Sequence, residues 1–134
     1  MFVDACAIIS IFMQEETATS YRDALGAADA PFTSALAAFE AVIILARPDR
    51  LNSTYGETLK DVLAWLHAYG IDLREASDSN TVLAYAITVA EGHGLGKRAL
   101  SNFDCFHYAH AKAAGAPLLT LDALLRQTDV ATLP

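Results

Sequence analysis

The sequence predicts one α/β domain over residues 1–134, built as three layers with a central, mostly parallel sheet flanked by helices. Short apolar segments alternate along the chain with longer segments of helical periodicity, which is the order typical of parallel strands joined by helical crossovers. Hydrophobic residues make up 54% of the chain and charged residues 19%, as expected of a protein with a substantial core. We find no internal repeat, linker or low-complexity segment that would divide it.

The expected strands are short and apolar, and several of them lead directly into a polar residue. Asp4 comes near the end of the first strand, and Asp122 follows the strand that ends at Thr120. The expected strands cover residues 2–5, 32–33, 71–73, 117–120 and 128–130.

Helices are expected between these strands, and capping residues indicate where several of them begin. Ser34 is a typical N-cap, and the helix after it must end before Pro48. Asn52 or Ser53 is expected to cap the next helix, which stops at Gly70. The expected helical segments cover residues 8–12, 15–28, 35–46, 54–69, 79–91 and 102–115.

Composition excludes several classes of protein. The formal net charge of −7 does not favour non-specific nucleic-acid binding, which depends on clustered Lys and Arg side chains. Cys6 and Cys105 are too few for a disulfide framework or a cysteine metal site, and we expect both to be free thiols. The apolar N-terminus has no basic leader, and no segment has the roughly 18 apolar residues of a membrane span, so we expect a soluble, cytoplasmic protein.

Four acidic side chains, Asp4, Glu40, Asp104 and Asp122, lie in apolar surroundings. Asp4 and Asp122 come at the ends of strands, where ligands of open α/β sheets bind; Glu40 is in mid-helix and Asp104 in the first turn of a helix. Unpaired buried charges are very costly, so four carboxylates without a neighbouring Lys or Arg require a common cation. Mg²⁺ or Mn²⁺ is the expected ion, since both prefer hard oxygen ligands.

Each acid also has a structural alternative. Asp104 could stabilise the N-terminus of its helix, and Asp122 could cap the short turn that follows it. Glu40 could pair with Arg47. Asp4 is the hardest of the four to explain without a ligand, because it interrupts an apolar strand. Together, the four acids favour a metal site more strongly than any one of them does alone.

These acids lie in four stretches of sequence, namely residues 1–8, 33–41, 102–112, and 117–122 with 128–130. In order and spacing, the stretches resemble the PIN-domain endoribonucleases, in particular the VapC-type toxins of bacterial toxin–antitoxin pairs. The resemblance implies that Asp4, Glu40, Asp104 and Asp122 form the catalytic, metal-binding set, with Mg²⁺ or Mn²⁺ as cofactor. It also implies cleavage of RNA phosphodiester bonds by a metal-activated water, a DNA-binding antitoxin as partner, and a homodimer.

Three positions depart from the pattern of these toxins. Cys6 stands where Ser or Thr is usual, Asp104 directly follows Phe103 without an intervening Gly, and Ala123 replaces a second acid beside the fourth one. Cys6 and Thr120 remain candidates for orienting a water or a metal ion. The departures motivate an alternative function, a PIN-fold module that binds an antitoxin or RNA with weakened catalysis. A phosphohydrolase acting on small substrates is a third possibility.

Further basic, histidine and cysteine residues were weighed for a role at the site. Lys97 and Arg98 precede the helix of the third acid and are candidates for RNA contact, with solvated loop charges as an equal alternative. His107 and His110 are three residues apart on one expected helix, but a zinc site would lack further ligands, so we expect a structural or surface role. Cys105 has apolar neighbours and is expected in the core.

Overall fold

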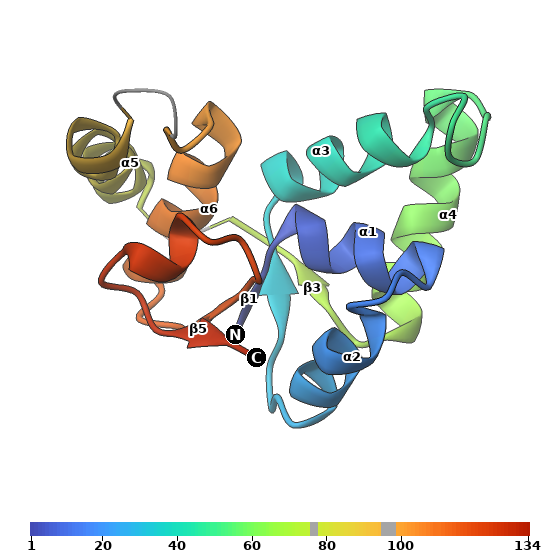
Figure 1. The fold of residues 1–134 in the computed structure, drawn as a ribbon, viewed down its shortest axis with the longest axis horizontal. Helices are drawn as coiled ribbons and strands as arrows, with labels where there is room; N and C mark the ends of the chain where they lie inside the picture. The colour runs from blue at the N-terminus through green and yellow to red at the C-terminus, as the bar shows by residue number, and fades with distance from the viewer. Residues whose placement is uncertain (76–77, 95–98) are drawn as a thin grey trace.

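The structure, a computed structural model, describes residues 1–75, 78–94 and 99–134. Its strands form one parallel sheet in the order β3-β2-β1-β4-β5, so β1 lies at the centre (Figure 1). Phe2 of β1 is in register with Phe32 on one side and with Leu118 on the other. The strands are β1 Phe2–Val3, β2 Phe32–Thr33, β3 Asp72–Leu73, β4 Leu118–Leu119 and β5 Thr132–Leu133.

Helices cover both faces of this sheet. Figure 1 shows α1, α2 and α4 on one side of the strands and α5 and α6 on the other, with α3 reaching from the end of β2 toward α4. The helices are α1 Ala5–Met13, α2 Ala18–Gly26, α3 Ala35–Leu45, α4 Tyr55–Ala68, α5 Ser79–His93 and α6 Asn102–Ala113, and a 3₁₀ helix, η1, covers Leu125–Gln127. The predicted three-layer α/β/α architecture is confirmed.

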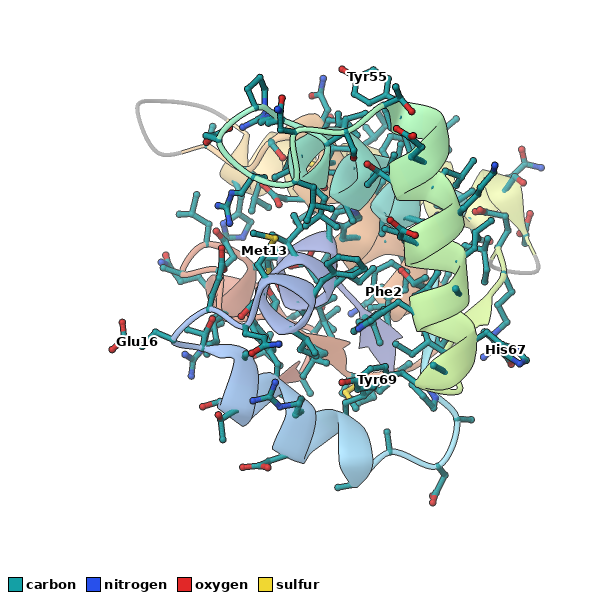
Figure 2. All side chains as sticks on the ribbon, turned by 90° about the vertical axis from the view of Figure 1, so that its right-hand side faces the viewer. Phe2, Met13, Glu16, Tyr55, His67 and Tyr69 are labelled. Atoms are coloured by element: carbon teal, nitrogen blue, oxygen red, sulfur yellow. The ribbon has the colours of Figure 1, made fainter. Side chains whose placement is uncertain are left out.

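Alternation along the strands divides the buried side chains into two cores. Val3 and Leu119 belong to the core that packs under α1–α4, whereas Phe2 and Leu118 belong to the core under α5 and α6. Successive side chains of a strand point to opposite faces, so even a two-residue strand serves both cores. In Figure 2, which looks from the α4 side, Phe2 lies inside the molecule, while Tyr55 and His67 lie at its rim.

Side-chain caps fix the starts of several helices. The hydroxyl of Ser34 accepts a hydrogen bond from the N–H of Ala37, as the sequence predicts, and Asp78 caps α5 in the same way. The α4 helix is capped instead by Thr54, which forms a capping box with Glu57; the prediction of Asn52 or Ser53 as the cap was wrong. Glu57 explains the difference, because it pairs only with a cap three residues before it.

The strand predicted at residues 128–130 was also wrong. The last strand is β5, which begins at Thr132 and pairs with β4. Thr128 instead closes the turn after η1, with its N–H and hydroxyl both donating to the carbonyl of Leu125. Asp129 turns outward to accept from the hydroxyl of Tyr108 and to pair with Lys112. These side-chain bonds replace strand pairing at this point.

Within the described ranges, no helix is long and apolar enough to cross a membrane.

Candidate metal centre

Asp4 occupies the junction between β1 and α1. Its backbone is extended, with φ −71° and ψ 154°, and it stands at the N-cap position of α1, yet its side chain makes no capping hydrogen bond. The carboxylate is directed into the protein instead, and only 3% of the residue is exposed. A buried carboxylate requires compensating partners, and three side chains supply them.

Cys6, Thr120 and His107 surround the Asp4 carboxylate. The Cys6 thiol and the Thr120 hydroxyl both donate to Oδ2, at 2.9 and 2.7 Å. The His107 Nδ1 lies 2.9 Å from the other oxygen, Oδ1. Cys6 and Thr120, the two residues expected to orient groups in the site, therefore hold Asp4 itself.

Asp4 and His107 are charged partners. Burial alone would raise the pKa of Asp4, but the contacts with His107, Cys6 and Thr120 outweigh it and hold that pKa below its usual value. Burial also works against protonation of His107, yet the negative charges of Asp4, Glu40 and Asp104 raise its pKa above the usual value. The two shifts agree, so we describe the contact as a carboxylate–imidazolium pair.

His107 also reaches Glu40, in the middle of α3. The imidazole is fully buried, and its Nε2 lies 3.4 Å from Glu40 Oε2. Neither ring nitrogen is aligned for a hydrogen bond, and in the described part of the chain both nitrogens and Glu40 Oε2 are buried without a hydrogen-bond partner. Burial, together with the charges of Asp4 and Asp104, raises the pKa of Glu40 despite the opposing effect of His107. About a fifth of the Glu40 side chain, 19%, is exposed, so this carboxylate forms the open side of the cluster.

Asp104 has the structural role weighed from the sequence and also acts on the cluster. It is the third residue of α6, and its Oδ2 accepts from the N–H of Ser101 at 2.8 Å while the Ser101 hydroxyl accepts from the N–H of Asp104 at 3.1 Å. This capping box stabilises the helix start. The same negative charge acts on both Glu40 and His107. Asp104 therefore lies beside the cluster, although it makes no direct bond to it.

Asp122 also caps a turn. Its Oδ1 accepts from the N–H groups of Leu124 and Leu125, at 2.8 and 2.9 Å, and so fixes the start of η1. Its own N–H donates to the Thr120 hydroxyl at 3.1 Å, and that hydroxyl donates to Asp4. Asp122 is thus linked to the cluster through Thr120 rather than by direct contact.

The structure therefore brings two of the four predicted acids, Asp4 and Glu40, onto one histidine. Among residues 1–75, 78–94 and 99–134, no three His, Cys, Asp or Glu side chains are already arranged to hold a metal ion. Lys97 and Arg98, the candidates for RNA contact, lie outside the described residues.

The central position of His107 was not predicted from the sequence. Its position three residues after Asp104 on the same helix, and hence on the same face, is the signal that could have identified it.

Comparison with known proteins identifies the class to which this fold and site belong. The PIN domain family model matches residues 1–131, so the chain belongs to the PIN domain family. Ribonuclease VapC30 of Mycobacterium tuberculosis is 26% identical to it over 133 residues, covering 98% of this chain and 97% of that protein. Ribonuclease VapC of Mycolicibacterium smegmatis is 28% identical over 132 residues, covering 98% of each.

Solved structures have the same architecture. Mycobacterium tuberculosis VapC20, a sarcin–ricin loop cleaving toxin, superposes with a TM-score of 0.72 at 13% identity, covering 99% of this chain and 98% of its own. VapBC-1 of nontypeable Haemophilus influenzae gives a TM-score of 0.69 at 16% identity, covering 98% and 94%. The predicted fold and family resemblance are both confirmed.

Proposed function

We propose that this chain is a divalent-metal-dependent endoribonuclease and the toxin of a toxin–antitoxin pair. The observation that carries this proposal is the buried acidic cluster at the carboxyl end of β1, the central strand, where Asp4 and Glu40 meet on His107. The cluster lies in a PIN domain whose curated relatives are named ribonucleases. Ligand sites of parallel α/β sheets are found at this edge.

The side chains present fit a divalent cation. We assign Asp4, Glu40, Asp104 and Asp122 as the residues that would hold Mg²⁺ or Mn²⁺, since carboxylate oxygens are the ligands these ions prefer. Glu40 Oε2 is a buried acceptor without a hydrogen-bond partner within the described ranges, so it is available to bind a cation. When bound, such an ion supplies Lewis-acid stabilisation of charge on phosphate and lowers the pKa of water.

The surrounding residues divide the remaining work. Cys6 and Thr120 hold the Asp4 carboxylate in place, so the carboxylate does not have to rearrange when RNA binds. Glu40 is the acid best placed to orient the attacking water, because about a fifth of its side chain, 19%, is exposed. No side-chain nucleophile is required.

The proposed partners follow from the resemblance of the chain to VapC-type toxins. A DNA-binding antitoxin would inhibit the toxin, RNA would be the substrate, and the toxin would form a homodimer. The structure contributes an apolar groove between α3 and α4 that suits protein–protein contact. Its exposed large side chains are Phe39, Tyr55, Leu59, Leu63 and Leu73.

Cleavage of RNA by the purified toxin, free of antitoxin, tests the proposed function. We expect cleavage with Mg²⁺ or Mn²⁺, none with a chelator, and a loss of ~10²-fold or more for Asp4→Asn, because the neutral amide cannot replace the carboxylate. Asp72→Asn is the matched control, since Asp72 is exposed on the edge strand β3. Full activity of Asp4→Asn would rule out the assigned site.

One observation favours the second candidate function, a catalytically weakened PIN-fold module that binds an antitoxin or RNA. The Asp4 carboxylate already has three side-chain partners, and no complete metal set is formed among the described residues. This alternative predicts binding of RNA or antitoxin with no metal-stimulated turnover. Growth arrest on expression that Asp104→Asn relieves would exclude it.

A further inference from the structure

We propose that His107 is a nitrogen ligand of the metal centre, with Nε2 and Glu40 Oε2 binding the same ion and Asp4 orienting the imidazole from behind. This inference rests on the proposed function; it adds a nitrogen ligand to the acidic set and places Asp4 at the imidazole rather than on the ion. A nitrogen ligand would also alter which metal the site prefers.

The distance between the two proposed ligand atoms is the first observation. His107 Nε2 and Glu40 Oε2 are 3.4 Å apart, and both are buried without a hydrogen-bond partner in the described part of the chain. Two ligands about 2.1 Å from one ion are about 3.0 Å apart in an octahedral site and about 3.4 Å apart in a tetrahedral one. The separation of these two atoms lies at the tetrahedral end of the range expected for ligands of a common ion.

The second observation is the carboxylate on the other side of the ring. His107 Nδ1 lies 2.9 Å from Asp4 Oδ1, and the second Asp4 oxygen is held by Cys6 and Thr120. Metal-bound histidines usually have a carboxylate at their second ring nitrogen, which fixes the tautomer and the ring orientation. Asp4 is placed to do this for His107 through its contact with Nδ1, so that Nε2 faces Glu40 and releases its proton to solvent when the ion binds.

The imidazole is also held rigidly by its neighbours. It is fully buried, and its ring centroid lies 6.0 Å from that of Phe2 on the central strand. A ligand locked by packing requires no ordering when the ion binds, which favours tight binding. Asp104, whose charge acts on both His107 and Glu40, is the further acid available to complete the set.

A nitrogen ligand changes the expected metal preference. Carboxylate sites suit Mg²⁺ and Mn²⁺ alike, whereas imidazole favours transition metals. We therefore expect this chain to bind Mn²⁺ at least ~10-fold more tightly than Mg²⁺. The preference depends on the side chain at position 107.

Spectroscopy of bound Mn²⁺ in the absence of RNA provides the direct test. Electron spin-echo envelope modulation detects ¹⁴N nuclei that are ligands of the ion, and calorimetry gives the Mn²⁺ and Mg²⁺ affinities of the same samples. The variant is His107→Gln, and the matched control is His110→Gln on the same helix, whose Nε2 faces Glu75 at 3.3 Å instead of the cluster. Circular dichroism verifies that both variants are folded.

We expect ¹⁴N coupling in the wild-type protein and in His110→Gln, its loss in His107→Gln, and a ~10- to 100-fold weaker Mn²⁺ affinity for that variant. Absence of the coupling in the wild-type protein overturns the inference, even if His107→Gln does not fold. Unchanged or tighter Mn²⁺ binding by folded His107→Gln also overturns it. RNA cleavage without nitrogen coupling would leave the proposed function standing, whereas coupling without cleavage of RNA under any metal would reject that function and retain the ligand.

Discussion

The pairing of Asp4 with His107 concentrates the electrostatics of the site in two buried side chains. The carboxylate follows β1, and the imidazole comes from α6, more than a hundred residues later in the chain. Removing one member of such a pair leaves the other charge buried and uncompensated, which costs far more than the intact pair contributes. The pair therefore couples the start of the fold to its last long helix.

The stability of the metal-free protein should depend on pH through this pair. The pKa of Asp4 is lowered in the folded protein, so the ionised carboxylate stabilises the fold above about pH 3.9, the pKa of Asp in the unfolded chain. This stability is lost as the pH falls through the pKa of Asp4 in the folded protein. The raised pKa of His107 contributes stability below its unfolded value of about 6.5, which is lost as the pH rises through the folded value. We expect wild type to exceed His107→Gln in unfolding free energy by roughly 3–5 kcal/mol between about pH 4 and 6.5.

Urea denaturation with chelator, from acid to alkaline pH, measures this difference. Subtracting the two proteins removes the titrations that they share. A difference that stays constant from acidic to alkaline pH would contradict the charged pair.

At the residue scale, the sequence predicted part of the site. Asp4 could be identified because a carboxylate within an apolar strand requires a partner. The spacing of three residues from Asp104 favours His107 but does not exclude His110, whose ring also lies beside Phe2. Of the two histidines, His107 is the one whose Nδ1 contacts the carboxylate of Asp4.

At the scale of elements, two of the predicted acids also organise the start of a helix. Asp104 closes the capping box of α6, and Asp122 caps η1. The structural and functional alternatives for these residues therefore do not exclude each other. A substitution that removes both the charge and the capping hydrogen bonds cannot distinguish the structural role of these residues from the functional one.

Asp122→Asn separates the two roles, because asparagine caps a helix as well as aspartate does but carries no charge. We expect its unfolding free energy to stay within ~0.5 kcal/mol of wild type, and its RNA cleavage to fall ~10²-fold if the charge helps to hold the ion. Ser101→Ala is the complementary control: it should cost ~1 kcal/mol of stability and retain cleavage. Wild-type turnover by Asp122→Asn would limit Asp122 to its cap.

Element boundaries were predictable where one residue could cap and harder where several could. Ser34 was predicted as an N-cap and is observed. Before α4, Asn52, Ser53 and Thr54 all have capping side chains, and the choice depends on Glu57 three residues after Thr54. The strand expected at residues 128–130 failed for a tertiary reason, since Tyr108 and Lys112 of α6 hold Asp129 outward.

At the scale of the whole molecule, the fold follows from very short strands that serve two cores. Apolar segments alternating with helices predicted the parallel sheet and its flanking layers, because few other arrangements bury such segments. The strand order could not be obtained this way. It places β1 between β2 and β4, and so brings the residues after β1 and β4 together at Asp4.

Phe2 tests how far the molecule depends on that central strand. Its ring is fully buried and packs edge-to-face on Phe32 and parallel to His110. We expect Phe2→Ala to lower the free energy of unfolding by roughly 3–5 kcal/mol, because the cavity cannot close. Phe39→Ala, at a position that is 54% exposed, should cost less than ~1 kcal/mol. If urea denaturation gave equal losses of unfolding free energy for the two variants, the packing of the central strand would contribute no more to stability than an exposed position does.

The thiol at position 6 gives the site a natural reporter. Burial and the charge of Asp4 raise the pKa of Cys6, so almost none of it is thiolate near neutral pH, and thiolate is the form that alkylating reagents attack. Labelling of Cys6 therefore requires the contact with Asp4 to open. The rate of labelling, followed by mass spectrometry beside that of Cys105 in the opposite core, would measure how often the cluster around Asp4 opens.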